Sequence, residues 1–300
     1  MRVTSVLALG VVGLTLTSAV PAFAQDTAPT AAGVSARSGL GPAFPADRQV
    51  FTAATAAYEA GDFKEAFRRV RPLAEKGLAQ AQTLLGELYE NGQGVSQDYA
   101  MAAQWYKKAA DQGYAVAQYS LGALYLQGEG VPHDPATSAK WFRKAADQGD
   151  AWSQYNLGVQ YSDGEGVPQN YAIAMELYKK AADQGNARAQ YDLGVIYTQG
   201  IGVSRDYAVA AAWYRKSADR GVASAQYNLA EQYVRGDGVP SDPVQAYKWM
   251  SLAVLNAETP DDHDMAAKAK DRIAGVMTKA QIAEAEAQVK AWKPTPWIKD

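Results

Sequence analysis

Apolar, aromatic and glycine positions recur along this chain with a period of 36 residues, from about residue 79 to residue 257. Two aromatic columns keep the same register through the copies, with Leu177 as the one departure: Tyr89, Tyr125, Tyr161, Tyr197 and Tyr233, and Trp105, Trp141, Trp213 and Trp249. Self-similarity at a fixed period of about 20–50 residues is typical of proteins in which each copy stacks on the next. The pattern therefore predicts five copies of one unit.

Each copy is predicted to form two helices. One helix begins after a residue whose side-chain oxygen can accept a free backbone amide, namely Asp98, Asp134, Asn170, Asp206 or Asp242. Pro135 and Pro243 follow two of these caps, at a position that favours proline. The helix ends at a glycine suited to a left-handed turn, which is Gly113, Gly149, Gly185 or Gly221. The other helix is predicted over 115–127 in the second copy and is followed by a Gly-x-Gly-Val loop that occurs in all five.

One further glycine column falls inside a predicted helix. It contains Gly86, Gly122, Gly158 and Gly194, and Ala230 takes the same place in the fifth copy. Glycine in a helix interior costs about 1 kcal/mol relative to alanine. Because this cost is repeated in four copies, we expect a close approach of two helices at each of these glycines.

The repeats are predicted to be closed at both ends by helices of a different pattern. Residues 47–78 contain an irregular first pair, with a short turn at Gly61 and Asp62. Residues 258–300 contain two helix starts, one at Thr259 followed by Pro260 and one at Thr278, which forms a capping box with Gln281. The second of these helices presents three large apolar residues on one side, Ile282, Val289 and Trp292. One continuous solenoid over residues 47–300 is the predicted organisation.

The N-terminus has the three parts of a secretory signal peptide. Arg2 precedes an apolar stretch from Val6 to Val20, and Ala22-Phe23-Ala24 is a cleavage pattern that would leave Gln25 first. The alternative is an uncleaved anchor, but the apolar stretch is shorter than the roughly 20 residues of a membrane-spanning helix. Residues 25–46 are rich in small and polar residues and are predicted to be a flexible leader. We therefore expect export to the periplasm or beyond, with no transmembrane segment after cleavage.

Composition narrows the functional classes. The chain has 300 residues, 48% of them hydrophobic and 20% charged, with a formal net charge of −3. This balance argues against nucleic-acid binding, which requires a basic face. Because cysteine is absent, disulfides, thiol nucleophiles and zinc–thiolate sites are excluded. Most of the 26 glycines lie in the repeat columns, so their number indicates turns between helices.

The unit with its Leu-Gly pair, Gly-x-Gly-Val loop and Trp-Tyr-x-Lys-Ala-Ala block resembles the Sel-one-like repeat, a relative of the tetratricopeptide repeat. The resemblance covers residues 79–257, and residues 51–78 more loosely. It implies an all-α, right-handed superhelical solenoid that acts as an interaction scaffold. It also implies that an exported bacterial member acts in envelope signalling, morphogenesis or host contact.

By resemblance to tetratricopeptide arrays, the first helix of each pair lines a concave groove. Three residues before the glycine column stands a tyrosine ladder, which consists of Tyr119, Tyr155, Tyr191 and Tyr227, with Thr83 in the first copy. Six residues before it stands a variable column, which consists of Gln80, Val116, Trp152, Arg188 and Ser224. Tyrosine, tryptophan and arginine carry much of the binding energy at interfaces. The eight residues predicted to bind a partner are Val116, Tyr119, Trp152, Tyr155, Arg188, Tyr191, Ser224 and Tyr227. The alternatives are that the ladder packs between repeats and that the variable column is a tolerant surface.

Other chemistry finds little support. The glycine loops lack the preceding strand and the following Lys-Ser/Thr of a phosphate-binding loop. The acidic run from Asp261 to Asp264 includes His263 and could hold a metal, but the helix start at Thr259 already explains the acids. His133 is expected in an exposed loop, and the sequence indicates no partner for it. No nucleophile arrangement stands out, so we predict a non-enzyme without metal or cofactor. A protein or peptide is the expected partner, and the alternative is a carbohydrate such as peptidoglycan or exopolysaccharide.

Overall fold

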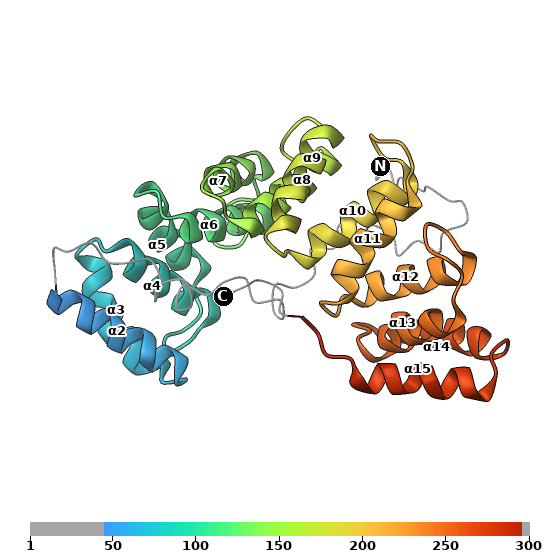
Figure 1. Ribbon diagram of the computed structural model, residues 1–300. Coiled ribbons are helices and arrows are strands. Elements are labelled where there is room, and N and C mark those ends of the chain that lie inside the picture. The colour runs from blue at the N-terminus through green and yellow to red at the C-terminus, as the bar shows by residue number, and fades with distance from the viewer. Residues whose placement is uncertain (1–44, 296–300) are drawn as a thin grey trace.

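The computed structural model describes residues 45–295, so the predicted signal peptide and nearly all of the predicted leader lie outside the described residues. Within that range the chain forms fourteen α-helices and no strand. Consecutive helices pack on one another in an arch that runs from α2 and α3, through α7 to α9, to α13, α14 and α15 (Figure 1). The predicted all-α solenoid is confirmed.

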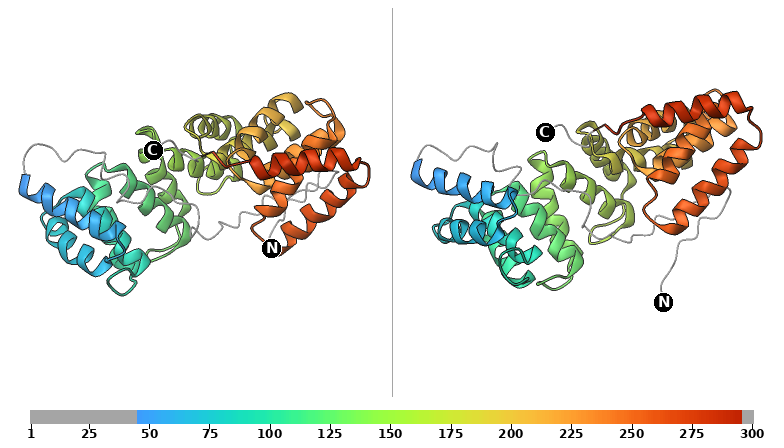
Figure 2. Two further views of the ribbon diagram at one scale, coloured as in Figure 1. Left: turned by 60° about the horizontal axis from the view of Figure 1, so that its bottom comes forward. Right: turned by 90° about the horizontal axis from the view of Figure 1, so that it is seen from below.

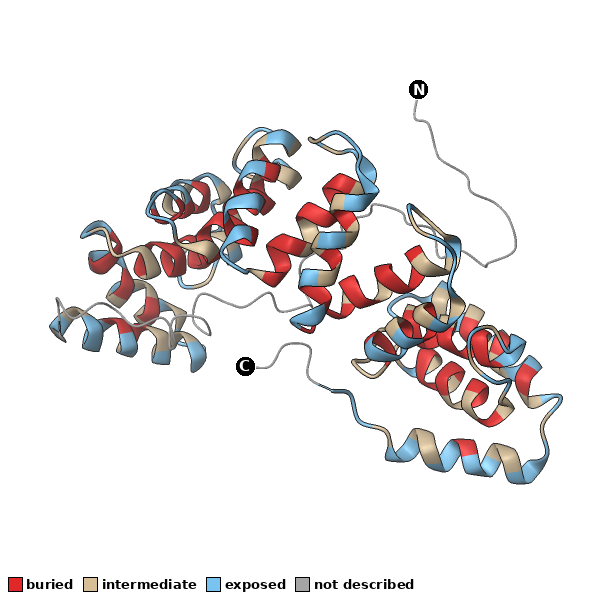
Figure 3. Ribbon diagram, turned by 45° about the horizontal axis from the view of Figure 1, so that its top comes forward, coloured by how far each residue is buried: buried red, intermediate tan, exposed pale blue. Residues whose placement is uncertain are grey.

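The five predicted repeats are five consecutive helix pairs. The first helix of each pair is called the A helix: α4 Ala79–Asn91, α6 Ala115–Gln127, α8 Ala151–Asp163, α10 Ala187–Gln199 and α12 Ala223–Arg235. The second is called the B helix: α5 Tyr99–Asp111, α7 Pro135–Asp147, α9 Tyr171–Asp183, α11 Tyr207–Ala218 and α13 Pro243–Leu255. Buried residues follow nearly every helix of the array, and exposed residues gather at the loops (Figure 3). The core is therefore distributed along the array, in four clusters of buried residues that each join neighbouring helices.

The helix boundaries follow the predicted signals. All five predicted caps, from Asp98 to Asp242, accept a backbone N–H in the first turn of a B helix. The glycines that end four of these helices have φ between 89° and 94°, a conformation that other residues rarely adopt. His133 is exposed as expected, and it has a partner that the sequence alone does not indicate. Its Nδ1 lies 2.7 Å from the carbonyl oxygen of Leu126 and closes the end of α6. Gln97 and Gln169 make the same contact in neighbouring repeats.

The glycines inside the A helices allow the close approach that their repetition predicted. A Cβ added at Gly122 would lie 2.8 Å from the Phe142 ring of the same repeat, and one at Gly194 would lie 2.4 Å from the Tyr214 ring. Gly86 and Gly158 face the rings of Tyr106 and Tyr178 in the same way. A flat ring therefore rests directly on the A-helix backbone, and the lost helix propensity is offset by packing.

The second glycine of the Gly-x-Gly-Val loop packs against the preceding helix, and in four of the five repeats it meets the backbone of that helix, whereas Gly202 meets the Cβ of Tyr171. At Gly130, φ is +66°, and an added Cβ would lie 2.2 Å from the carbonyl carbon of Tyr99, at the start of the preceding B helix. Gly94, Gly166 and Gly238 meet the backbone of the preceding B-type helix in the same way. No side chain fits between these two backbones, so the position requires glycine.

A buried glutamine in each A helix bridges three helices. The Nε2 of Gln118 donates to the carbonyl oxygen of Ala110 in the preceding repeat at 3.2 Å, and its Oε1 accepts from Gln148 in its own repeat at 2.7 Å. The same pairing joins Gln82 to Gln112, Gln154 to Gln184 and Gln226 to Asn256. Repeat four is the exception, because Arg220 replaces the second glutamine and the Oε1 of Gln190 has no hydrogen-bond partner.

The ends are closed by helices of a different pattern, as predicted. α2 Pro45–Glu59 and α3 Phe63–Glu75 precede the first repeat, and α2 begins two residues before the expected boundary at 47. α14 Pro260–Ala274 and α15 Lys279–Ala291 cover the far end beyond α13 (Figure 2). Thr278 and Gln281 form the predicted capping box. After α15 the chain turns back, and the N–H of Thr295 donates to the carbonyl oxygen of Asp219 at 2.8 Å.

Candidate partner-binding face

The rings of the tyrosine ladder are used in packing within their own repeats. Tyr119, Tyr155 and Tyr191 lie with their ring centroids 5.8–5.9 Å from the aromatic ring of the B helix in the same repeat. Tyr119 and Tyr227 are 7% and 4% exposed, whereas Tyr155 and Tyr191 are partly buried. A partner would therefore contact Tyr155 and Tyr191 more readily than Tyr119 and Tyr227.

The hydroxyls of Tyr155 and Tyr191 lie close to the residue 37 positions ahead, in the A helix of the next repeat. Asp192 raises the pKa of Tyr155, and a hydrogen bond with Asn228 opposes the rise that burial causes in the pKa of Tyr191. The buried hydroxyl of Tyr119 has no hydrogen-bond partner among the described residues. Burial is the main reason that the pKa of Tyr155 lies well above its usual value, and the Asp192 carboxylate adds to the effect. Tyr155 and Tyr191 therefore connect successive repeats through polar contacts.

Asp192 stands out in this column because it carries a charge in a buried position. Burial raises the pKa of Asp192 to about 7, although the hydrogen bond from Tyr155 and the positive charge of Arg188 oppose this shift. Arg188 is four residues before Asp192 on the same face of α10. The structure thus brings together Tyr155, Arg188 and Asp192, two of which are predicted site residues.

The variable column divides into buried and partly exposed members. Val116 and Trp152 are 9% and 6% exposed, whereas Gln80, Arg188 and Ser224 are partly exposed. Trp152 belongs to a core cluster with Leu157 and Tyr161. Its contribution to partner binding stays a prediction, and the part of it that is accessible in the free protein is small.

The A helices lie on the inner side of the arch. In Figure 1, α6 and α8 lie on the inner side of the arch relative to α7 and α9. We call the surface formed by the tyrosine ladder and the variable column the inner face.

Two carboxylates extend this polar surface into the first repeat. The Tyr58 hydroxyl donates to Glu87 at 2.5 Å, and the Tyr106 hydroxyl donates to Glu90 at 2.5 Å. Burial raises the pKa of Glu90 to about 7, with a smaller contribution from the charge of Glu87. Neither carboxylate is among the residues predicted to bind a partner, although the two lie one and four residues after Gly86, at positions expected to face the groove. Both are charged residues at A-helix positions where the other copies mostly have apolar or small residues, such as Ala123 and Val159. This departure from the pattern could have revealed them.

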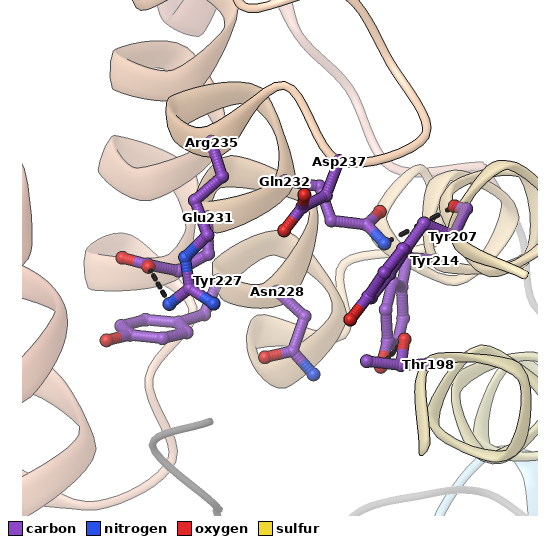
Figure 4. Close-up of a pocket in the computed structure, with 9 residues that line it drawn as sticks. All are labelled: Thr198, Tyr207, Tyr214, Tyr227, Asn228, Glu231, Gln232, Arg235 and Asp237. Atoms are coloured by element: carbon purple, nitrogen blue, oxygen red, sulfur yellow. Dashed lines mark hydrogen bonds and ion pairs between the residues drawn. The ribbon is translucent and has the colours of Figure 1, made fainter. Parts of the chain in front are cut away.

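A small pocket lies between α10, α11 and α12, where repeats four and five meet (Figure 4). It measures about 60 Å³ and is lined by Thr198, Tyr207, Tyr214, Tyr227, Asn228, Glu231, Gln232, Arg235 and Asp237. Arg235 donates to Glu231 at 2.8 Å, and Thr198 donates to the hydroxyl oxygen of Tyr214 at 3.1 Å. The sequence analysis predicted only Tyr227 among these residues, because they come from three helices and a loop.

Comparison with known proteins decides the family. The Sel1 repeat model matches five consecutive segments, 79–114, 115–150, 153–186, 187–222 and 223–256. The chain belongs to the Sel1 repeat family. A Sel1 repeat protein from Oxalobacter formigenes is 31% identical with a TM-score of 0.65, and the match covers 73% of this chain and 97% of that one.

Two other Sel1-type structures are more distant. A protective antigen of uropathogenic Escherichia coli with an SLR fold is 26% identical, with a TM-score of 0.42 over 82% of this chain and 76% of that one. A Sel1 repeat protein from Klebsiella pneumoniae is 22% identical, with a TM-score of 0.44 over 69% and 99%. No protein of curated function matches this Sel1 repeat chain.

The described part of this Sel1 repeat protein contains neither a candidate metal cluster nor a candidate membrane span. Among residues 45–295, no group of three or more histidine, cysteine, aspartate or glutamate side chains is arranged to hold a metal ion. The acids at Asp261 and Asp262 lie in the first turn of α14, and Thr259 caps that turn through the N–H of Asp262. No helix in the described part of the chain is long and apolar enough to cross a membrane.

Proposed function

We propose that this protein is a non-catalytic scaffold of the bacterial envelope and binds a protein or peptide partner on its inner face. Sel1 repeat proteins generally mediate protein–protein interactions, and the chain contains five such repeats in one unbroken stack. One observation carries the placement on the inner face. The columns that hold the stack together are nearly constant, whereas the variable column changes its chemistry in every copy.

Three members of the variable column support this placement because they remain partly exposed. Gln80, Arg188 and Ser224 are spread over repeats one, four and five, so an extended segment lying along the arch would meet each in turn. Arginine is among the residues that carry most energy at interfaces. The signal peptide predicted over residues 1–24 supports the envelope as the place where the partner is met.

A photo-crosslinking amino acid at Ser224, placed in the protein within the native bacterium, tests the proposal. We expect a protein adduct in the periplasmic fraction. A crosslinker at Gln104, an exposed residue of the B helix α5, is the matched control and should give no such adduct. In the Ser224 background, Arg188→Ala should reduce the yield about fivefold, because loss of an interface arginine typically costs more than about 1 kcal/mol.

Two results would contradict the proposal. Equal adducts from Ser224 and Gln104, or a yield unchanged by Arg188→Ala with normal helicity, would remove the inner face as the binding surface. An adduct confined to the cytoplasm would contradict the envelope location. Retention on purified peptidoglycan that Arg188→Ala abolishes, without any protein adduct, would favour the carbohydrate alternative.

A further inference from the structure

The pocket between repeats four and five contains a buried acceptor without a partner. Gln232 is 6% exposed, and its Nε2 donates to the carbonyl oxygen of Tyr207 at 3.4 Å. The Oε1 of the same amide has no hydrogen-bond partner. A buried acceptor left without a donor costs about 1–3 kcal/mol. A ligand that brings an N–H group into this pocket would recover that energy.

The charge of the pocket also favours a donor. Glu231 forms an ion pair with Arg235 on the next turn of α12, so these two charges balance. No described residue forms a hydrogen bond or an ion pair with the side chain of Asp237, which leaves one uncompensated carboxylate at the pocket (Figure 4). Tyr207, Tyr214 and Tyr227 also line it, and aromatic faces attract cations.

The size of the pocket limits what can enter. About 60 Å³ admits the end of one side chain, whereas pockets for cofactors and drug-sized ligands measure roughly 300–1,000 Å³. A sugar ring or a nucleotide is therefore too large. An ammonium or guanidinium group on a flexible stem combines the small size, the positive charge and the N–H donors that the lining residues call for.

The same junction in repeats two and three provides an internal comparison. Gln160 donates to the carbonyl oxygen of Pro135 at 3.1 Å, and its Oε1 also lacks a partner. However, Leu126, Pro135 and Phe142 occupy the places of Thr198, Tyr207 and Tyr214. The glutamine occurs at both junctions, but the polar surroundings occur at the junction of repeats four and five.

We infer that this pocket binds the lysine or arginine side chain of a partner segment. The inference rests on the proposed function and names the chemistry of the partner. Asp237 supplies the charge, Gln232 accepts one N–H, and the tyrosine rings enclose the alkyl stem. The pocket would thereby fix the register of a basic peptide at the C-terminal end of the repeat array.

The direct test uses capped amino acids as probes. Nα-acetyl-lysine methylamide and its arginine, norleucine and glutamate counterparts are titrated into the full chain, and the side-chain amide of Asn228, which also lines the pocket, is followed by NMR. We expect the two cations to shift this signal in a saturable manner that weakens with salt, and norleucine and glutamate to leave it unchanged. Asp237→Asn and Gln232→Leu should each weaken cation binding about fivefold or more.

Matched controls come from repeat three. Glu165 is the loop counterpart of Asp237, and Gln160 is the counterpart of Gln232. Glu165→Gln and Gln160→Leu should leave cation binding unchanged. Leucine is already the residue at the position of Gln160 in repeats one and two, as Leu88 and Leu124. Equal binding of norleucine, or cation binding that survives Asp237→Asn in a normally helical protein, would overturn the inference.

The crosslinking experiment separates this inference from the proposed function. If the Ser224 adduct forms in wild-type protein and Asp237→Asn leaves its yield unchanged, the scaffold proposal stands and the cation pocket is overturned. If the wild-type adduct never forms, the scaffold proposal fails. Both the scaffold proposal and the cation pocket would be supported by a crosslinked partner peptide that contains a lysine or arginine, if mutation of that residue lowers the yield as much as Asp237→Asn does.

Discussion

Repeats two and five fill the contact between their A and B helices with different residues. In repeat two the ring of Phe142 rests on Gly122, whereas in repeat five Met250 and Ala230 take the corresponding places. Phe142, Met250 and Ala230 are all fully buried. A methyl group added on the A helix is thus matched by a thinner, more flexible side chain on the B helix. The two positions change together, so the contact is what each repeat preserves.

Repeat four shows what happens when one member of a contact changes alone. Arg220 stands where Gln112, Gln148 and Gln184 stand in the first three repeats, and the Oε1 of Gln190 is left without a donor. Asp192 places a carboxyl group in the column where Asn156 and Asn228 are neutral. Repeat four therefore carries one buried acceptor without a donor, Gln190, and one buried carboxyl group, Asp192, and both positions differ from the pattern of the neighbouring repeats.

The largest effect is expected when the alanine found in repeat five is introduced into repeat two while the Phe142 ring stays in place. Gly122→Ala places a methyl group 2.8 Å from the Phe142 ring, and overpacking of this kind costs about 1–3 kcal/mol. Alanine regains roughly 1 kcal/mol of helix propensity, so we expect a net loss of up to about 2 kcal/mol in the free energy of unfolding, measured by urea denaturation.

The double variant Gly122→Ala/Phe142→Met also replaces the ring by the methionine found in repeat five. It should recover a large part of this loss. Leu126 lies one helical turn after Gly122 on α6. It is apolar, as is its counterpart Val234 in repeat five. Phe142→Met alone serves as the second arm of the cycle. Strictly additive effects of the two substitutions would show that repeats two and five do not share one contact.

A comparable effect, dependent on pH, is expected at Asp192. Its pKa in the folded chain is about 7, against about 3.9 when unfolded, so the folded state holds the proton more tightly. This contribution to stability is fully present below about pH 4 and is lost as the pH rises to about 7. Asp192→Asn, which copies Asn156 and Asn228, should therefore raise the free energy of unfolding at pH 8 by roughly 2 kcal/mol.

At pH 4 the same variant should differ little from wild type. Glu90, whose pKa is also raised to about 7, keeps its own contribution, so Asp192→Asn should reduce the pH dependence without abolishing it. Urea titrations at pH 4, 6 and 8 measure both effects. A gain in stability at pH 4 as large as at pH 8 would show that the charge of Asp192 is not the cause.

The smallest effect is expected when the second glutamine, which hydrogen-bonds the A-helix glutamine in repeats one to three, is introduced into repeat four. Arg220→Gln restores the residue type that donates to the A-helix glutamine at 2.7–2.8 Å in repeats one to three. Satisfying the Gln190 Oε1 should stabilise the protein by about 1 kcal/mol. The thermal midpoint measures it, and Arg220→Gln/Gln190→Leu is the control in which no gain is expected. A gain that persists in this control would assign the effect to loss of the arginine.

Most of the fold was predictable because each repeat carries its own local signals. The caps from Asp98 to Asp242, the glycines that end the B helices and the capping box at Thr278 act within three or four residues of their positions. The period then multiplies these signals by five. The close contact at Gly122 was also expected, because a repeated propensity cost requires a repeated gain.

The candidate site was less predictable because its properties depend on residues that are 16 to 37 positions apart. The position of Tyr155 predicts that it lies on the A helix, but its burial depends on the Tyr178 ring and on Asp192 of the next repeat. The Gln232 pocket depends on Thr198 and Tyr214 of the preceding repeat. These contacts arise only when repeats are stacked, and the period alone does not specify which side chains meet.

The contact between each loop glycine and the preceding helix has a consequence for how such a chain can grow or shrink. Gly130 meets Tyr99 and Gly166 meets Pro135, in each case 31 positions back along the chain. Removal of residues 115–150 would bring Gly166 to the same distance from Tyr99 and keep every loop in register. Loss of any other length would break a loop contact. The array is thus free to change by whole units of 36 residues, and a longer or shorter binding face can be obtained without redesigning either end.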